Sequence, residues 1–381
     1  MKNYIIDLNF YNIMSKDLTL NLKENNVPIS IGENLVFSLD FLNFCKTLGN
    51  RFVIITDQNV EKLYGEKLNL FFQNQHMDSF IISIPAGDSF KTRETKALIE
   101  DQMLQKKINK SALIIALGGG MVLDMAAFVA STYYRGIPLV MVPTSLLAMV
   151  DASIGGKTAV NTKEGKNLIG SYYHPKKIFI DLQFLKTLPK EEYRNGFSEI
   201  IKYGIIYDKD LFSSLYEKTQ GHDLEEIIYK CCLIKKTIVE RDEKENNIRA
   251  ILNFGHTLGH SLENLESYKI SHGEAISLGM IFASFLSVKM KILKREDFFK
   301  IFSMFKKYHF PLVFSQNISA KDIFDKLLSD KKAKLNRNFV LIEKIGSIKE
   351  DIYLQEVDEK ILKKALFWLC NRFSSKAELW K

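Results

Sequence analysis

Cysteine is scarce in this sequence, and the placement of the few cysteines excludes a disulfide-stapled scaffold and a cysteine-based zinc site. The 381 residues include four cysteines, Cys45, Cys231, Cys232 and Cys370, and no two of them form a C-x-x-C pair. The adjacent residues Cys231 and Cys232 cannot easily form a bridge. We therefore expect the cysteines to be small buried apolar side chains in a reducing compartment.

Segments that would direct the chain into or across a membrane are also lacking. The N-terminal residues MKNYIIDLNF contain no long apolar stretch of the kind found in a secretory signal. The longest apolar run, 112–130, is near the length of a membrane span, but it includes three consecutive glycines and Asp124, whose charge would be costly in lipid. We interpret the run as a buried strand, a turn and a helix, and we expect a cytoplasmic protein without membrane contact.

The positive charge of the chain lacks the patterns that are typical of nucleic-acid binding. The formal net charge is +8, but the lysines are spread along the chain. The densest run, 289–307, alternates with apolar residues at helical spacing, as on a solvated helix face. Zinc-finger spacing, an RNA-binding aromatic string and a basic arm are all missing. We therefore expect no nucleic-acid partner.

The first half of the sequence alternates strand and helix signals. Short apolar, β-branched runs predict strands, and segments with helical spacing of apolar residues separate them. The predicted strands are 51–56, 79–84, 112–117 and 137–142, and the predicted helices are 59–72, 92–107 and one that begins near residue 121. Repeated β-α-β units predict an α/β fold with a doubly wound, Rossmann-like sheet, whose ligands collect at the carboxyl ends of the strands.

The pattern changes after about Pro189, where helical periodicity dominates. The predicted helices are 191–207, 224–241, 251–265, 272–293, 295–308 and 320–328, and the run NFVLIE predicts one later strand. A chain of this length suggests about two domains. We therefore divide the chain into a Rossmann-like domain, 1–189, and a mostly α-helical domain, 190–381.

Three consecutive glycines, Gly118–Gly120, lie between a predicted buried strand and a predicted helix. Glycine permits positive φ and a close approach of backbone N–H groups to an anion, and a helix N-terminus adds partial positive charge. A pyrophosphate is the expected ligand, although the pattern is neither G-x-G-x-x-G nor a P-loop, and a simple tight turn is the alternative. Asp124 is either a ligand contact or a first-turn charge.

Histidines cluster in the second half of the chain. His256 and His260 are four residues apart in a helical segment and therefore face the same side, and His272 follows. Glu199 lies in another helical segment. Two histidines and one carboxylate form a common set of ligands for a catalytic divalent ion with open positions. Structural histidines are the alternative.

The segment 143–170 is rich in Gly, Lys, Asn, Thr and Asp, and we interpret it as a long polar loop rather than core. Such loops tend to be functional. Within it, Lys157, Lys166 and Asn167 have side chains suited to binding an oxyanion.

Further polar residues accompany the proposed metal ligands. Lys202 follows Glu199 by three residues on the same helix face, where a surface salt bridge is the alternative. Arg249 and Asn253 precede His256 at helical spacing and are expected to share its face. Other basic candidates, each on its own more typical of a surface, are Arg135, Lys235, Lys331 and Lys332.

The motifs closely resemble those of the 3-dehydroquinate synthase family. The matching segments, in family order, are GGGMVLDMAAFVASTYYRGI, VPTSLLAMVDASIGGKTAVN, GKNLIGSYYHP, GFSEIIKYG, RAILNFGHTLGHSLE and SHGEAISLGM. The resemblance runs from about residue 57 to about residue 332. It implies a Rossmann-like domain, a helical domain, a homodimer, bound NAD and one divalent metal, with Zn²⁺ most common and Co²⁺ possible.

The resemblance also implies a role for individual residues. The implied metal ligands are Glu199, His256 and His272. The implied NAD contacts are Asp57, Asn59, Asp88, Lys91, Gly119, Gly120, Asp124, Thr144, Ser145, Leu147, Lys166, Thr187 and Leu188. The implied catalytic residues are Asp151, Lys157, Lys202, Arg249 and His260, and the other implied substrate contacts are Asn167, Lys235, Asn253 and, across a dimer interface, Arg135. Asp88 departs from the family's usual Glu and is one methylene shorter, and Ser145 replaces the commoner Thr.

The reaction implied by the resemblance converts 3-deoxy-D-arabino-heptulosonate 7-phosphate into 3-dehydroquinate and phosphate. Transient oxidation of the C5 hydroxyl by NAD acidifies the neighbouring C–H, so that phosphate can leave before re-reduction and aldol closure. Lys157, Asn167 and Asn253 suit the phosphate, Arg249 suits the carboxylate, and His260 is a candidate proton shuttle. The alternatives are another sugar-phosphate cyclase, against which Arg249 speaks, or a non-catalytic NAD-binding paralogue.

Overall fold

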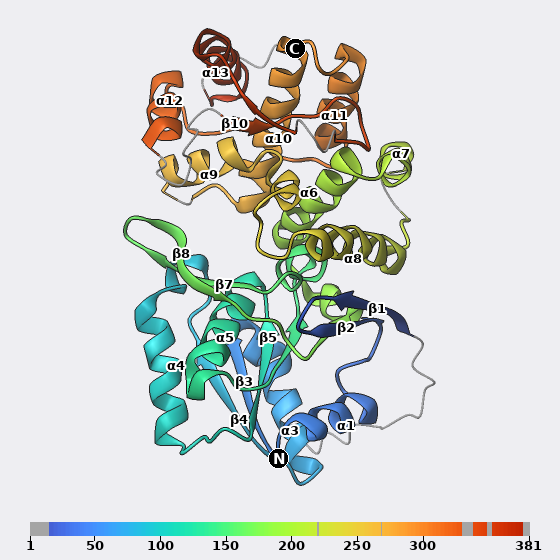
Figure 1. The fold of residues 1–381 in the computed structure, drawn as a ribbon, viewed down its shortest axis with the longest axis vertical. Helices are drawn as coiled ribbons and strands as arrows, with labels where there is room; N and C mark the ends of the chain where they lie inside the picture. Colours follow the sequence, from blue (N-terminus) through green and yellow to red (C-terminus); the bar gives the residue numbers. More distant parts are fainter. Residues whose placement is uncertain (1–14, 219–220, 268, 330–337, 349–352, 376–381) are drawn as a thin grey trace. The chain divides into compact units, whose positions relative to one another are not determined.

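The chain folds into two compact units in the computed structural model (Figure 1). The structure describes residues 15–218, 221–267, 269–329, 338–348 and 353–375. The first unit comprises the described part of 1–193 together with 228–243, and the second comprises the described parts of 194–227 and 244–381. We expected a single division between residues 189 and 190. The structure differs, because residues 228–243 return to the first unit. The N-terminal decapeptide, Lys331 and Lys332 lie outside the described residues.

A seven-stranded sheet forms the centre of the first unit. Its strands are β1 (Ser15–Asn21), β2 (Asn26–Gly32), β3 (Arg51–Asp57), β4 (Asp78–Ile84), β5 (Ala112–Gly118), β6 (Leu139–Pro143) and β9 (Lys177–Asp181). The order is β1-β2-β9-β6-β5-β3-β4, and all pairs except β1–β2 are parallel. The predicted α/β class and the four predicted strands are confirmed.

The strand order reverses between β3 and β5. From β3 the chain continues to β4 on one side, and from β5 it continues to β6 and β9 on the other. Asp57 ends β3 and Gly118 ends β5, and the two strands pair in parallel register. The carboxyl ends of strands at such a reversal form the usual ligand site of a doubly wound sheet, so the fold brings these two termini to that place.

Helices and short turns connect these strands. The bounds are α1 (Leu39–Leu48), α2 (Gln58–Val60), η1 (Glu61–Gly65), α3 (Glu66–Asn74), η2 (Asp88–Phe90), α4 (Arg93–Gln105), α5 (Gly120–Thr132), η3 (Tyr133–Arg135), η4 (Ala148–Ala152), η5 (Leu182–Thr187) and, largely within this unit, α8 (Leu224–Arg241). Figure 1 shows α5 and α4 beside the sheet.

The apolar run 112–130 forms a strand, a turn and a helix, as predicted. Every residue of β5 is buried, because the sheet is covered on both faces. No helix in the described ranges is long and apolar enough to cross a membrane. The cysteines are all free thiols, and Cys45, Cys231 and Cys232 are buried, whereas Cys370 is half-buried.

The expectation of a long polar loop over 143–170 is wrong. Residues 157–172 form an antiparallel hairpin of β7 (Lys157–Thr162) and β8 (Gly165–Tyr172), which projects from the first unit (Figure 1). The preceding turn η4 contains the buried side chains of Ala148, Met149 and Val150. Composition suggested a loop because β8 is largely exposed and β7 has polar residues among its buried ones.

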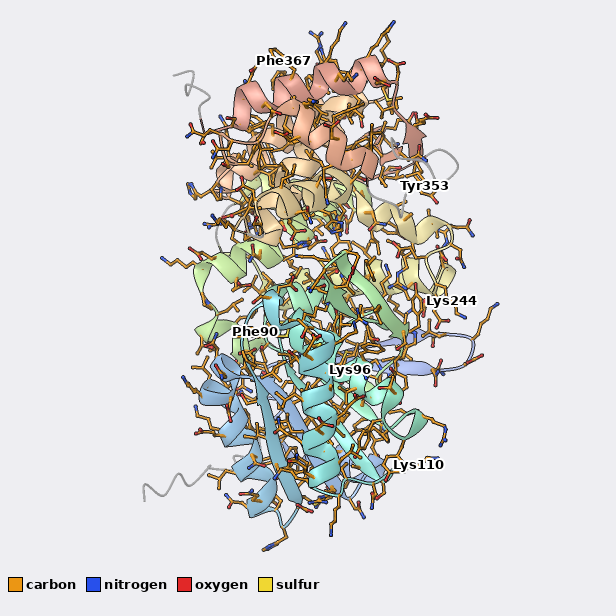
Figure 2. The ribbon with its side chains drawn as sticks, turned by 90° about the vertical axis from the view of Figure 1, so that its left-hand side faces the viewer. Phe90, Lys96, Lys110, Lys244, Tyr353 and Phe367 are labelled. Carbon is orange, nitrogen blue, oxygen red and sulfur yellow. The ribbon has the colours of Figure 1, made fainter. Side chains whose placement is uncertain are left out.

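The second unit is mainly helical. Its elements are α6 (Lys190–Ile206), α7 (Lys209–Glu217), η6 (Ile248–Asn253), α9 (His256–Leu265), α10 (His272–Lys289), α11 (Arg295–Lys307), α12 (Ala320–Ser329), β10 (Asn338–Val340), β11 (Leu354–Glu356) and α13 (Glu359–Phe373). The predicted helices other than 251–265, and the strand in NFVLIE, are confirmed. The last helix α13 buries Leu366 and Leu369 and leaves Phe367 64 % exposed (Figure 2).

The predicted continuous helix 251–265 is interrupted. Gly255 has φ +82, and the chain passes from the 3₁₀ turn η6 to α9 through this left-handed residue. Arg249 and Asn253 therefore do not share a helix face with His256, contrary to expectation. A glycine suits this position, because other residues rarely adopt positive φ.

Candidate active site

At the end of β5, limited space rather than positive φ favours glycine at positions 118 and 120. A Cβ on Gly118 would lie 2.6 Å from Val122, and one on Gly120 would lie 3.3 Å from Ala152. Gly119 is the N-cap of α5 with extended backbone, and no side chain caps this helix. The first N–H groups of α5 are thus left without a side-chain acceptor, which fits the expected pyrophosphate contact. The positive-φ reason given by the sequence is wrong for these three residues.

Lys91 joins two residues that the sequence assigned to different ligands. Its Nζ donates hydrogen bonds to Asp124 Oδ2 and, at 2.6 Å, to Asn167 Oδ1. Burial raises the pKa of Asp124, and the charge and hydrogen bond of Lys91 oppose that rise. Asp124 is not a first-turn charge, since it lies beyond the first turn of α5. The network links a predicted cofactor residue to a predicted substrate residue.

Asp88 and Lys166, both predicted to contact the cofactor, contact each other. The Lys166 Nζ lies 3.0 Å from Asp88 Oδ2, and Asn161 Nδ2 donates to the same oxygen at 3.2 Å. The Asp88 carboxylate thereby ties η2 to the hairpin β7–β8. The methylene missing relative to Glu is compatible with this internal role.

Asp57, Asn59 and Thr187 lie at or near the ends of elements of the first unit. Asp57 caps α2 by accepting from the backbone N–H groups of Asn59 and Val60 at 2.9 and 3.1 Å. The Thr187 hydroxyl lies 2.7 Å from the Tyr64 hydroxyl. Asn59 and Thr187 are exposed, whereas Leu188, Ser145 and Leu147 are half-buried and Thr144 is buried.

Asp151 and Lys235, two predicted substrate residues, form an ion pair. The Lys235 Nζ lies 2.8 Å from Asp151 Oδ1 and also donates to the Asp151 carbonyl oxygen. The Lys235 side chain is buried, so the expectation that it is a surface lysine is wrong. Lys157 at the start of β7 and Arg135, which has φ +64, are both exposed.

The second unit brings the three predicted metal ligands together. Glu199 Oε1 lies 3.7 Å from His256 Nε2 and 3.6 Å from His272 Nε2, and the ligand atoms of the three residues lie within 4.8 Å of one another. Metal bonds of about 2.0–2.2 Å in tetrahedral geometry place neighbouring donors roughly 3.3–3.6 Å apart. The donor set and its spacing therefore fit a divalent ion such as Zn²⁺.

Close packing of α9 against α10 sets the separation of the two histidines. A Cβ on Gly279 would lie 1.9 Å from the Gly255 carbonyl oxygen, and one on Gly259 would lie 2.5 Å from Ile276. His256 and His272 are the first residues of these helices. Ser271 and Glu274 form a capping box that fixes the start of α10.

The surroundings of the two histidines shift their pKa values in opposite directions. Burial and the nearby Lys202 hold the pKa of His256 well below its usual value. Burial also acts to lower the pKa of His272, but hydrogen bonds with Glu199 and Glu263 outweigh it and raise that pKa to about 9. Lys202 contacts Glu199 Oε2, and both side chains are almost fully buried, so the surface salt-bridge alternative is wrong.

Three other predicted residues of this unit differ in exposure. His260 is exposed on α9, with its ring centroid 5.3 Å from that of His256. Arg249 is 2 % exposed. Asn253 Nδ2 donates to Glu245 Oε1 at 2.8 Å. Sequence reasoning overlooked Glu245, which no spacing signals.

Glu263 was also overlooked, although its spacing offers a signal. It lies seven residues after His256 and three after His260, so all three lie on one side of α9. Glu263, His260 and His272 form a second group whose ligand atoms lie within 4.8 Å of one another.

Solved structures with the same fold define the class as that of the sugar-phosphate cyclases. A 2-epi-5-epi-valiolone synthase from Streptomyces hygroscopicus, solved with NAD⁺ and Zn²⁺ bound, is 26% identical with a TM-score of 0.83 over 92% of this chain and 98% of that chain. A 2-deoxy-scyllo-inosose synthase, complexed with carbaglucose-6-phosphate, NAD⁺ and Co²⁺, is 24% identical with a TM-score of 0.83 over 93% of this chain and 100% of that chain.

Within that class, the chain belongs to the 3-dehydroquinate synthase family. The family's N-terminal model matches residues 81–195 and its C-terminal model matches residues 196–333. The 3-dehydroquinate synthase of Thermoanaerobacter pseudethanolicus is 40% identical over 91% of this chain and 99% of its own, and that of Rippkaea orientalis is 40% identical over 85% and 91%. The function implied by the motifs, 3-dehydroquinate synthesis, is thereby confirmed.

Proposed function

We propose that this 3-dehydroquinate synthase works with bound NAD and one divalent metal held by Glu199, His256 and His272. The observation that carries the proposal is the convergence of these three ligand atoms, from three different helices, at metal-binding distances. When bound, NAD supplies a hydride acceptor, and the metal supplies a Lewis acid that polarises hydroxyl oxygens of the substrate. Zn²⁺ suits the donor set, and Co²⁺ is the second candidate.

The cofactor contacts proposed for the first unit surround the reversal point of the sheet. The open N-terminus of α5 at Gly119 and Gly120 binds the pyrophosphate, while Asp57 and Asn59 lie at the end of β3. The remaining contacts are Asp88, Lys91, Asp124, Thr144, Ser145, Leu147, Lys166, Thr187 and Leu188. Lys91 is held in place by Asp124 and therefore presents its charge in one orientation.

The substrate contacts follow from the charge that each side chain offers. Lys157, Asn167 and Asn253 bind the phosphate, and the guanidinium of Arg249 binds the carboxylate. Lys235, positioned by Asp151, adds a buried positive charge on the substrate side. Arg135 acts across the interface of a homodimer, and the homodimer and a cytoplasmic location remain predictions.

Proton movement at the site is assigned to His260 of the second unit. His260 is exposed and therefore exchanges protons with solvent through its ring nitrogens. The Lys202 ammonium contacts Glu199 and places a positive charge beside this proposed metal ligand. The substrate's phosphate is itself able to accept the proton from the acidified carbon, so no further base is required.

The test is release of inorganic phosphate from 3-deoxy-D-arabino-heptulosonate 7-phosphate by the purified protein. Phosphate should be released with NAD and Zn²⁺ present, and a chelator should stop the release. His256→Ala should lose bound metal by elemental analysis, while His309→Ala, a matched histidine outside the site, should keep it. Full turnover after complete metal removal, or unchanged metal content in His256→Ala, would contradict the proposal.

A further inference from the structure

The two ring nitrogens of His272 face two different carboxylates. Nε2 lies 3.6 Å from Glu199 Oε1, and Nδ1 lies 3.4 Å from Glu263 Oε1. A neutral imidazole that binds a metal through one nitrogen carries its proton on the other. A carboxylate can only accept a hydrogen bond, so Glu263 selects the tautomer with the proton on Nδ1 and a lone pair on Nε2.

The second histidine ligand has a different outer partner. His256 Nδ1 lies 3.2 Å from the backbone carbonyl oxygen of Phe254, which is neutral. The partner of His272 is instead the side-chain carboxylate of Glu263. The Glu263 side chain is 3 % exposed, whereas that of His272 is 30 % exposed, so the carboxylate supports the imidazole from the buried side. A charged acceptor makes the imidazole a more basic ligand than a carbonyl does.

We propose that Glu263 is the positioning residue of the metal site: its carboxylate orients His272 and strengthens Nε2 as a metal ligand. The inference rests on the proposed function in that it takes Glu199, His256 and His272 as the ligands. Glu263 touches neither metal nor substrate and acts through His272 alone.

A direct role of Glu263 as a ligand is the competing arrangement. Glu263, His260 and His272 also lie at metal-binding distances from one another. That arrangement leaves out the buried Glu199, and it depends on His260, which is exposed on α9. The two arrangements therefore differ in which histidine, His256 or His260, the metal requires.

The experiment is a titration of the metal-free full-length protein with Co²⁺ against a competing chelator, followed by the visible absorption of the bound ion. Glu263→Gln should weaken Co²⁺ binding about 10- to 100-fold and alter the absorption band, because outer partners tune metal ligands by that amount. Glu274→Gln is the matched control. It removes a charge two residues from His272, but glutamine at this position retains the capping box, so binding should change by less than about twofold.

Each other outcome has a stated meaning. Equal Co²⁺ affinity and absorption in wild type and folded Glu263→Gln would overturn the inference and leave the proposed metal site intact. An equal loss in Glu263→Gln and Glu274→Gln would overturn it too, because charge alone would then explain the effect. If Glu263→Gln fails to fold, Glu263→Asp replaces it: the shorter side chain should weaken binding, and unchanged binding overturns the inference.

Two further results separate this inference from the proposed function. A loss of Co²⁺ binding in His260→Ala as large as that in His256→Ala would make Glu263 a direct ligand and refute its positioning role. A wild-type protein that binds no Co²⁺ or Zn²⁺ would refute the proposed metal site itself, and the inference with it.

Discussion

Replacement of Gly279 by alanine tests whether close helix packing sets the geometry of the metal site. The added Cβ would lie 1.9 Å from the Gly255 carbonyl oxygen, whereas ordinary contacts begin near 3.4 Å. The two helices α9 and α10 would have to separate by about 1.5 Å, which is a large displacement for a packed interior. His256 and His272 begin these helices, so their separation from Glu199 would change by a similar distance.

The expected cost follows from that clash. Overpacking of a well-packed core costs about 1–3 kcal/mol. The added Cβ would clash with backbone rather than with a flexible side chain, so we expect a cost at the upper end of that range. A loss of about 3 kcal/mol corresponds to a fall in Tm of roughly 6–12 °C for a unit of this size. Metal retention should fall as well, because the donor atoms no longer match bond lengths of about 2.0–2.2 Å.

Gly65→Ala is the matched control for this measurement. Gly65 has helical φ of −60, and a Cβ there would meet its nearest neighbour at 3.5 Å. This change should be neutral or stabilise by up to about 1 kcal/mol. The two variants are compared by calorimetric Tm and by bound zinc per chain. A Gly279→Ala protein with wild-type Tm and full metal content would refute the packing argument.

The remaining predictions concern the dependence of Tm on pH and the buried carboxylate of Asp181. In metal-free protein the pKa of His272 is raised to about 9, above an unfolded value near 6.5. The stabilisation by the charged form of His272 is complete below pH 6.5 and is lost as the pH rises to 9, so the Tm of the metal-free protein should fall across that window. His272→Gln should flatten this dependence of Tm on pH. An equally steep dependence in the variant would contradict the assignment to His272. Asp181 accepts from the backbone N–H groups of Asn34, Val36 and Gln183, at 3.0–3.1 Å, and is fully buried. Asp181→Ala leaves buried donors unsatisfied and should cost about 2–4 kcal/mol by urea unfolding. Asp181→Asn keeps one acceptor oxygen and should cost less, so equal losses would contradict this hydrogen-bond account.

Periodicity predicted strands β3 to β6 and nearly all helices, but not the strands β1, β2 and β9 on one side of the sheet. Strands β3, β5 and β6 are largely continuous apolar runs, because both faces of a parallel sheet are buried. Strand β1 is largely exposed and has the composition of a polar loop, so periodicity did not identify it. The buried strand β9 was left unassigned because it is only five residues long. The helices α1 and α7 were also left unassigned, since short amphipathic segments differ little from loops in composition.

The site was predicted more completely than its supporting contacts. The resemblance named the three proposed ligands, and the fold brings them together. The break at Gly255 and the partnership of Glu263 with His272 were not predicted, because they depend on one backbone angle and on contacts between helices.

The sequence by itself determined the alternation of strands and helices, the family and the side-chain types that are able to carry charge or to ligate a metal. These are properties of residue type and local order. Only the tertiary structure decided which nitrogen of His272 faces which carboxylate, that Lys202 is buried against Glu199, and that Gly118 and Gly120 serve close packing. These outcomes depend on distances between segments far apart in the chain, and such distances result from packing rather than from local spacing.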